Sequence, residues 1–365
     1  MRSIRIDKPL LLILATLIVG GAAIFVSAAF GILAKGGSHT SSVVFNHLVL
    51  GVGLGLILLL ISSSIEYRLW RTYAPYMFAL ALIATALVFV PHIGFEHGGG
   101  RRWIDVLGFT FQPSELLKLT AVLMSAAYFS ALREKSSSWF GLLGFGAVLA
   151  VPTALLVAQP DIGTLGVVCI SVLAVFTAAG ARFRDIAVIC LVGLSALAVL
   201  AYARPYMLDR VTTFLRPSEN QQAEGYQIKQ SLIAIGSGGM FGRGFGQGVQ
   251  KFTYLPEPMG DSIFAVVGEE IGFIGSLGII AIFLTLALRG FSIATRIPDM
   301  FGALTAVGIS AYFVGEAFIN IASMVGLAPL TGIPLTFVSQ GGSAMLVSLA
   351  SAGILLNISR RASKK

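Results

Sequence analysis

Long apolar segments separated by short polar stretches run along nearly the whole chain. Taken in order, they predict ten membrane-spanning helices, at about residues 9–34, 46–65, 73–92, 112–132, 140–158, 162–181, 184–202, 262–288, 300–324 and 335–357. Several of these segments exceed the roughly 20 residues that cross the hydrocarbon layer as an α-helix, so we expect some of the helices to tilt. We therefore predict an all-α, polytopic membrane protein with one integral membrane domain over residues 1–365.

The basic residues lie mainly on one side of these predicted helices. That side carries Arg2, Arg5, Lys8, Arg68, Arg71, Arg133, Lys135, Arg182, Arg184, Arg289, Arg296, Arg360, Arg361, Lys364 and Lys365. The short loops of the other side hold only Lys35, Arg101 and Arg102. Because cytoplasmic loops of membrane proteins are enriched in Lys and Arg, both termini are predicted to be cytoplasmic.

The composition supports the membrane class and excludes others. The chain is 56% hydrophobic and 12% charged, whereas soluble domains carry about 25% charged residues. A net charge of +8 could indicate nucleic acid, but the predicted topology already explains where the basic residues lie, so no nucleic-acid partner is expected. Cys169 and Cys190 lie in apolar runs and indicate neither a disulfide framework nor a zinc site.

One connection, residues 203–261, is far longer than the others and is predicted to lie outside the cytoplasm. Connections of this length usually have a function. A short amphipathic helix is predicted within it, near residues 222–236. No internal repeat is visible, so a secondary transporter built from inverted repeats has no direct support.

Charged residues inside membrane spans are costly and are candidates for function. Glu115 and Lys118, at positions i and i+3, are expected to pair on one helix face. This pair is either structural or part of the polar wall of an outward-facing cavity. Asp161 is expected to cap a helix. Of the adjacent Glu269 and Glu270, at most one need face a given cavity. A packing or hydrogen-bonding role is open for Glu316.

Two further stretches are unusual for a membrane protein. Residues 236–248, GSGGMFGRGFGQG, contain seven glycines in thirteen positions. They predict either close-packed or flexible turns, or a backbone nest for a phosphate-bearing headgroup beside Arg243. Residues 254–264, YLPEPMGDSIF, place Asp261 directly before an apolar run. Asp261 could cap the next helix or act as a general base at the membrane surface. These patterns alone leave a transporter, a channel and a lipid-processing enzyme open.

Six motifs together resemble the SEDS family (shape, elongation, division and sporulation), which includes FtsW and RodA. They are GGGRRWI (98–104), FQPSELLKL (111–119), AQPDIGT (158–164), the glycine run, YLPEPMGDSIFAVVGEEIGF (254–273) and LTGIPLTFVSQGGSAM (330–345). Their order and the long loop between spans seven and eight make the resemblance specific. Residues 230–258, QSLIAIGSGGMFGRGFGQGVQKFTYLPEP, are more similar to the FtsW branch of the family, which acts in cell division, than to the RodA branch.

The resemblance implies a peptidoglycan glycosyltransferase that polymerises lipid II at the outer face of the bacterial cytoplasmic membrane. Partners would be a class B penicillin-binding protein, which is the transpeptidase, and other divisome proteins. Asp261 matches the family's essential aspartate and would be the general base, with undecaprenyl pyrophosphate as the leaving group. Candidate substrate-binding residues are Arg101, Arg102, Glu115, Lys118, Arg210, Arg216, Arg243, Lys251, Glu257 and Ser339. A divalent cation, Mg²⁺ or Mn²⁺, would suit the departing pyrophosphate, although the sequence shows no dedicated metal motif.

The chain departs from the family pattern at several positions. Met259-Gly260 replaces the usual His-Thr before the aspartate, and Ser262 replaces the Phe after it. Glu316 stands where a glutamine is common, and the motif near the end reads Ser339-Gln340-Gly341-Gly342-Ser343-Ala344 instead of Ser-Tyr-Gly-Gly-Ser-Ser. The imidazole and hydroxyl of the usual His-Thr are therefore not required here if the chemistry is intact.

Other functions stay open from the sequence. A lipid II flippase would need a hydrophilic path across the whole membrane, whereas the polar residues cluster toward the outer side. A non-catalytic divisome scaffold would not depend on Asp261. A RodA-like role in elongation is the alternative within the family.

Overall fold

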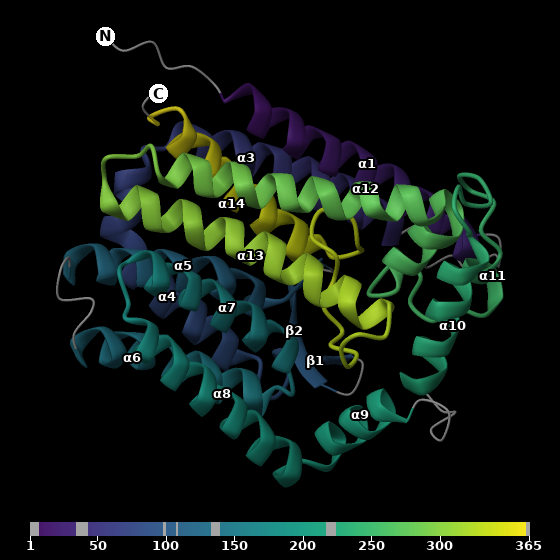
Figure 1. Cartoon of the computed structure of the whole chain (residues 1–365), viewed down its shortest axis with the longest axis horizontal. Coiled ribbons are helices and arrows are strands. Elements are labelled where there is room, and N and C mark those ends of the chain that lie inside the picture. Colours follow the sequence, from purple (N-terminus) through teal and green to yellow (C-terminus); the bar gives the residue numbers. More distant parts are fainter. Residues whose placement is uncertain are drawn as a thin grey trace.

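The computed structural model describes residues 7–33, 43–97, 100–106, 109–132, 139–216 and 224–362. Within this part of the chain the fold is almost entirely helical, which confirms the predicted class (Figure 1). The elements are α1 (Lys8–Leu33), the π-helix η1 (Asn46–Gly53), α3 (Leu54–Ser64), α4 (Tyr67–Leu87), β1 (Gly94–His97), β2 (Gly100–Val106), β3 (Phe109–Phe111), α5 (Pro113–Leu132), α6 (Trp139–Ala158), α7 (Ile162–Ala178), α8 (Phe183–Ala203), α9 (Pro205–Leu215), α10 (Glu224–Ser237), α11 (Gln250–Thr253), α12 (Ile263–Ala294), α13 (Met300–Met324) and α14 (Gly342–Ser359).

Every predicted span falls on a helix. Among the described residues, 8 helices are long and apolar enough to cross a membrane. The other two predicted spans coincide with α7, which is shorter, and with α4, which carries arginines in its first turns. The bounds of three predicted spans were wrong. Helix α12 continues to Ala294 rather than ending near 288. Helix α4 runs from Tyr67 to Leu87 rather than over 73–92, and α14 begins at Gly342 rather than near 335.

The helices differ sharply in how deeply they are buried. In the most apolar 18-residue window of α14, 78% of residues are buried, and α5 and α13 are similar at 67% and 61%. In the corresponding window of α8, 0% of the residues are buried. Figure 1 shows α8 along one edge of the bundle, with α13 near its centre. Helices α5, α13 and α14 therefore form the core on which a site can be held rigidly, while α8 exposes its apolar side chains.

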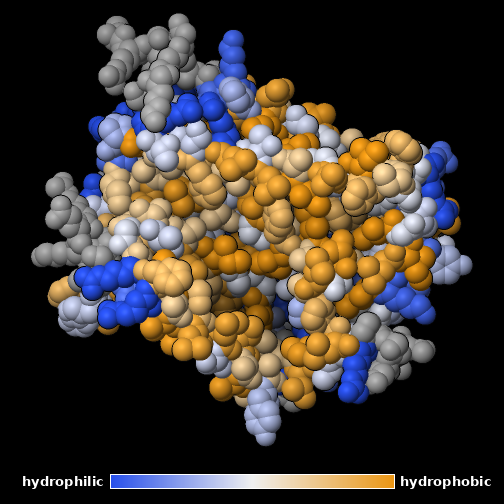
Figure 2. Space-filling model, in the orientation of Figure 1, coloured by the Kyte–Doolittle hydropathy of each residue, from blue (hydrophilic) through white to orange (hydrophobic). Residues whose placement is uncertain are grey.

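The surface agrees with a membrane setting. Figure 2 shows hydrophobic side chains across most of the visible face, with hydrophilic residues gathered mainly toward the ends. A soluble protein would not expose such a wide apolar surface. The protein is therefore a multi-pass membrane protein.

A small antiparallel sheet, in the order β1-β2-β3, was not predicted. Phe95 pairs with Trp103, and the next residue of β1 pairs with Arg101, so Arg102 lies in a bulge. Bulges redirect side chains. Here the Arg102 guanidinium donates hydrogen bonds to the carbonyl oxygens of Gln159 and Pro160, which ties the sheet to the segment between α6 and α7.

Helix α12 is broken at Gly272, where φ is 69° and ψ is −167°. The glycine run fills this break. The amides of Arg243 and Gly244 donate to the carbonyl oxygens of Glu269 and Glu270, and the amide of Phe273 donates to Gly239 O. Irregular backbone at membrane depth needs such partners. The glycine run therefore forms close-packed turns. Several of its amides are already bonded within the protein, which disfavours the predicted phosphate nest.

The long connection between α8 and α12 is largely helical. Helix α10 confirms the predicted amphipathic helix over residues 224–236, while residues 222–223 lie outside the described part of the chain. Helix α9 was not predicted. In Figure 1 both helices lie at the end of the bundle where α12 begins, which is the end that carries Asp261.

Candidate active site

Asp261 lies in a tight turn just before α12. The turn begins at Glu257, which has a positive φ of 45°. The carbonyl oxygen of Glu257 accepts hydrogen bonds from the amides of Gly260 and Ser262, at 3.0 and 3.2 Å. Ser262, not Asp261, is the N-cap residue of α12, and it makes no side-chain capping bond. The half-buried Asp261 carboxylate is therefore not used as a cap of α12.

The environment of Asp261 favours a protonatable carboxylate. Burial raises the pKa of the Asp261 carboxyl to about 6, and the negative charge of Glu257 acts in the same direction. The charge of Arg210 and a hydrogen bond from Gln227 act in the opposite direction. A carboxylate with a pKa near 6 is charged at neutral pH and can still accept a proton, as a general base must.

Helix α10 reaches the site through Gln227, which sequence reasoning missed. Its side chain hydrogen-bonds to Asp261, and its Nε2 donates to Ser262 Oγ at 3.0 Å. Ser262 thus supplies a hydroxyl next to the aspartate. The signal available in the sequence was only that Gln227 is a polar residue on an amphipathic helix of the long loop.

The backbone around Asp261 is held by residues from α13 and from the segment before α14. Asn320 Nδ2 donates to Asp261 O at 2.8 Å, Ser339 Oγ donates to Gly260 O at 2.8 Å, and Gln340 N donates to Met259 O at 2.6 Å. Ser339, predicted to bind substrate, is 4% exposed, and its hydroxyl also accepts from Leu335 N. In this conformation Ser339 therefore contacts the backbone beside the aspartate.

Lys118 lies at the centre of a buried ion cluster between α5 and α13. Its Nζ is 2.7 Å from Glu115 Oε2 and 2.8 Å from Glu316 Oε1. The predicted pair of Glu115 and Lys118 is confirmed, and Glu316 joins it as a second carboxylate. All three side chains are at most 2% exposed. In this conformation they are buried between helices, so neither Glu115 nor Lys118 reaches a solvent-exposed surface.

Lys251 is the centre of a second buried cluster, beside the break in α12. Its Nζ donates to Glu270 Oε1, to Gly246 O and to both oxygens of Ser27 on α1. The adjacent Glu269 and Glu270 both bond to backbone amides in this cluster. Glu269 accepts from the amides of Val249 and Gln250, and Glu270 accepts from Gly246 N, so both carboxylates hold the same segment.

The predicted arginines lie in different surroundings. Arg102 contacts the α6–α7 segment, and Arg243 lies 3.8 Å from Glu269. Arg101 and Arg216 are exposed, and Arg210 is half-buried. Of these, Arg210 is close enough to Asp261 to favour its charged form. The exposed Glu257 lies in the turn that carries Asp261.

Asp161 caps α7 as predicted. Its carboxylate accepts from the amide of Thr164 at 3.3 Å. The same carboxylate contacts Gln112 and Ser114, at 3.2 Å each. Asp161 therefore joins the start of α5 to the start of α7.

Within the described residues, no group of three or more His, Cys, Asp or Glu side chains could hold a metal ion. Asp261 and Glu257 are nevertheless two carboxylates in one turn. Mg²⁺ in phosphate-transferring sites is commonly bound by one or two carboxylates together with substrate phosphates and water. The exposed Glu257 fits that limited role, and the predicted divalent cation stays a prediction.

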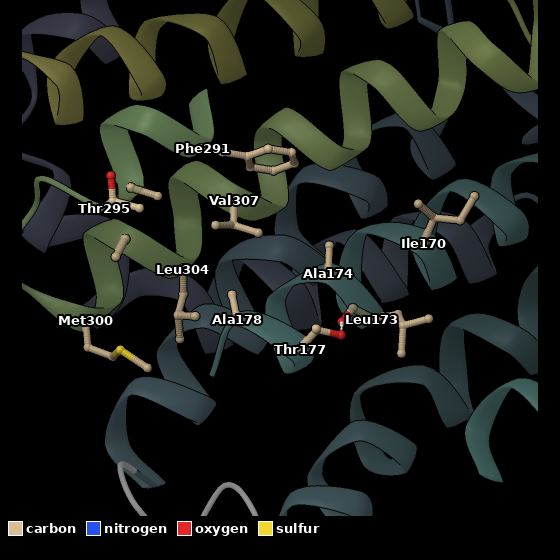
Figure 3. Close-up of a pocket in the computed structure, with 12 residues that line it drawn as sticks. Ile170, Leu173, Ala174, Thr177, Ala178, Phe291, Thr295, Met300, Leu304 and Val307 are labelled. Carbon is tan, nitrogen blue, oxygen red and sulfur yellow. Dashed lines mark hydrogen bonds between the residues drawn. The ribbon is translucent and has the colours of Figure 1, made fainter. Parts of the chain in front are cut away.

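A cavity of about 620 Å³ lies at the opposite end of the bundle. It is lined mainly by apolar residues of α7, α12 and α13, including Leu173, Phe291 and Leu304. Figure 3 shows these side chains around a space with no charged group among them. The cavity therefore offers a surface for hydrocarbon and no acid–base chemistry.

The whole chain is similar to proteins of one family. The family model for cell cycle proteins of the FtsW, RodA and SpoVE type matches residues 8–364. Stage V sporulation protein E of Bacillus subtilis is 38% identical over 315 residues, which cover 86% of each chain. The probable peptidoglycan glycosyltransferase FtsW of Geobacter sp. (strain M18) is 36% identical over 364 residues, 99% of each chain.

Solved structures agree with the sequence relatives. A chain of a peptidoglycan synthase complex superposes with a TM-score of 0.79 at 26% identity, covering 97% of this chain and 98% of that one. The rod shape determining protein RodA of Thermus thermophilus superposes with a TM-score of 0.71 at 26% identity over 100% of both chains. With a family model, near-full-length relatives and a shared fold all in agreement, the chain belongs to the FtsW/RodA/SpoVE family.

Proposed function

We propose that this protein is a peptidoglycan glycosyltransferase that polymerises lipid II, with Asp261 as the general base. The observation that carries the proposal is the half-buried Asp261 carboxylate, with its pKa raised to about 6, in a rigid turn at the start of α12. Family membership supports the reaction class, because relatives that match nearly the whole chain are named as probable peptidoglycan glycosyltransferases.

The proposed reaction is a single displacement. Asp261 takes the proton from the 4-hydroxyl of the acceptor sugar, and that oxygen forms a bond to the anomeric carbon of the donor. The bond between this carbon and the phosphate oxygen breaks, and its electron pair leaves with undecaprenyl pyrophosphate. Attack from the face opposite the α-linked leaving group gives the inverted β-linkage. The carboxylate must be deprotonated at the start of this step.

The pyrophosphate that leaves gains negative charge and needs cations near it. Arg210 is our first candidate because its charge already acts on Asp261. Arg101 and Arg216 are the exposed alternatives. Lys118 and Lys251 are second-rank candidates, since carboxylates inside the protein hold both of them. A divalent cation held by Glu257 together with the phosphates would supply further positive charge there.

We further propose a role in cell division, beside a class B penicillin-binding protein and other divisome proteins. Relatives named FtsW reach 36–40% identity, whereas the solved RodA is 26% identical, which favours division over elongation. A solved neighbour belongs to a peptidoglycan synthase complex, which supports a transpeptidase partner. The basic residues on one side support placement in the bacterial cytoplasmic membrane with both termini in the cytoplasm.

The test is polymerisation of fluorescent lipid II by the purified protein, with and without its cognate transpeptidase and with Mg²⁺ or Mn²⁺. Asp261→Asn keeps the side-chain shape and removes the base, so glycan chains on a gel should disappear. Asp299→Asn is the matched control. Asp299 caps α13 through Gly302 N at the other end of the bundle, and asparagine caps a helix as well as aspartate does. Equal polymer from the wild type and from Asp261→Asn would remove Asp261 as the base.

The pH dependence gives a second test of the same site. Because the base must be charged, and burial raises its pKa to about 6, kcat should fall as the pH drops through about 6 and level off above 7. The measurement is the initial polymerisation rate at saturating lipid II from pH 5 to 8. A rate that is flat down to pH 5 would contradict this assignment.

The same assay separates the two other functions. A flippase would move the lipid II headgroup across vesicle membranes without making polymer. A scaffold would bind the transpeptidase equally well with Asp261→Asn and would make no polymer itself. The buried Asp261 turn favours catalysis over both, because neither of them needs a carboxylate that can exchange its proton.

A further inference from the structure

Three consecutive carbonyl oxygens at the candidate base accept hydrogen bonds from a distant part of the chain. Met259 O, Gly260 O and Asp261 O are bonded by Gln340 N, Ser339 Oγ and Asn320 Nδ2, at 2.6, 2.8 and 2.8 Å. Met259 and Ser339 are at most 5% exposed, and Asn320 is 0% exposed. The backbone that carries the Asp261 side chain is thus fixed from one side by α13 and by the segment that precedes α14.

Asn320 has a special place among these donors. Its amide nitrogen donates to Asp261 O and also to Ile333 O, both at 2.8 Å. The NH₂ group of an asparagine has two hydrogens to donate and its carbonyl oxygen has none. Only this orientation can therefore serve both acceptors. One side chain on a core helix joins the catalytic turn to the segment around residue 333.

We propose that Asn320 is a positioning residue for Asp261, acting through the backbone carbonyl of the aspartate rather than on the substrate. This inference rests on the proposed function. A general base must be held within about half an ångström of its productive position, and a displacement of 1 Å can lower a rate about 100-fold. The bonds within the turn at 257–262 end on the carbonyl oxygen of Glu257. The bond from Asn320 Nδ2 instead holds the Asp261 carbonyl itself, while its second bond ties Asn320 to Ile333 O.

A purely structural role makes a different prediction. If Asn320 only joined α13 to the 330–341 segment, its loss would lower the stability of the whole protein and reduce activity in proportion to unfolding. A positioning role lowers kcat in the fraction that is folded. It leaves KM unchanged, because Asn320 is buried and makes no contact with substrate.

The chain offers a matched control. Asn357, on α14 at the other end of the bundle, is also buried. Its Nδ2 donates to Ser63 O at 2.7 Å, and its Oδ1 accepts from Tyr67 N at 3.1 Å. Asn357→Ala therefore removes two hydrogen bonds from a buried asparagine, as Asn320→Ala does, without touching the Asp261 turn.

The experiment compares Asn320→Ala, Asn357→Ala and the wild type in the lipid II polymerisation assay, normalised to folded protein. We expect Asn320→Ala to lower kcat about 10- to 100-fold with KM unchanged, and Asn357→Ala to leave both parameters within about twofold of the wild type. Hydrogen exchange of the amides of Gly260 and Ser262 should become at least tenfold faster in Asn320→Ala only. Exchange needs no activity, so it tests the contact even if the proposed reaction is wrong.

Ser339 provides a second variant in case Asn320→Ala does not fold. Ser339→Ala should lower kcat and speed exchange at the same turn, and Ser339→Thr, which keeps the hydroxyl, should restore both. Normal kcat and normal exchange in folded Asn320→Ala would overturn the proposal, as would equal losses in Asn320→Ala and Asn357→Ala. If Asp261→Asn polymerises normally while exchange at the turn responds to Asn320, the proposed base has failed and the contact alone stands.

Discussion

Two buried lysines in this protein are satisfied in very different ways. Lys251 has four oxygen partners, on Glu270, Gly246 and Ser27, and thus one carboxylate for one ammonium group. Lys118 lies between two carboxylates, Glu115 and Glu316, and Glu316 Oε2 has no hydrogen-bond partner among the described residues. The first cluster has one carboxylate for one ammonium group, and the second has two carboxylates for one ammonium group.

The difference follows from what each cluster joins. The Lys251 cluster fixes irregular backbone, because Gly246 O and the break in α12 need partners inside the membrane. The Lys118 cluster joins two regular helices whose backbone groups are already satisfied, so only its own charges matter. We therefore expect the Lys118 cluster to depend on the balance of charge and the Lys251 cluster to depend on the order of a loop.

Lys118→Met should have the largest effect. It leaves Glu115 and Glu316, both at most 2% exposed, without the cation between them. Breaking a buried ion pair by removing one partner costs about 3–5 kcal/mol, and two stranded carboxylates put this variant at the upper end, about 5 kcal/mol. Denaturant unfolding in detergent measures the loss. The exposed Lys229→Met is the control and should leave the free energy of unfolding unchanged.

Lys251→Met should have a smaller effect on global stability, at the lower end of the same range, about 3 kcal/mol. Glu270 would still accept hydrogen bonds from Ser27 Oγ and Gly246 N. The loss should instead concentrate in the glycine run, whose amides should exchange hydrogen faster while those of α5 do not. Equal acceleration in both regions would contradict the difference drawn between the two clusters.

The sequence predicted one contact of the Lys118 cluster and none of the Lys251 cluster. The spacing of Glu115 and Lys118 was enough to predict their contact, because residues at i and i+3 share a helix face. Nothing in that spacing could find Glu316, which lies 198 positions from Lys118. Lys251 was assigned to the substrate because it is a basic residue in a long loop. Its partner Ser27 lies 224 positions away on α1.

The fold was more predictable than the site for the same reason. Apolar runs locate a helix at each of the ten predicted spans, 8 of them long and apolar enough to cross a membrane among the described residues, since each helix satisfies its own backbone within the membrane. The sheet was missed because its strands are short, with 4, 7 and 3 residues, and show no long alternation of apolar and polar positions. Asp261 was identified through the motif around it, whereas Asn320 was not identified. The only signal for Asn320 in the sequence was that it is a polar residue within an apolar span.

Ser27→Ala should have a modest effect, about 1–3 kcal/mol. It removes a hydroxyl that donates to Glu270 and accepts from Lys251 at 3.0 Å. The ion pair between Lys251 and Glu270, at 2.6 Å, stays in place. Ser27→Thr keeps the hydroxyl and should recover most of the stability. A loss as large as that of Lys251→Met would mean that Ser27, rather than the ion pair, holds the loop.

Glu316→Gln should have the smallest effect, a change within about 1 kcal/mol. The amide oxygen can still accept from Lys118, while the cluster is reduced to one carboxylate for one ammonium group. Lys118 then keeps one carboxylate, Glu115, at 2.7 Å, which is the ratio already present around Lys251.

Glu316→Gln should also recover part of the stability lost in Lys118→Met, because the double variant strands one carboxylate instead of two. Unfolding measured for the single and double variants forms a double-mutant cycle. A loss above 3 kcal/mol in Glu316→Gln alone would show that the second carboxylate is required rather than in excess.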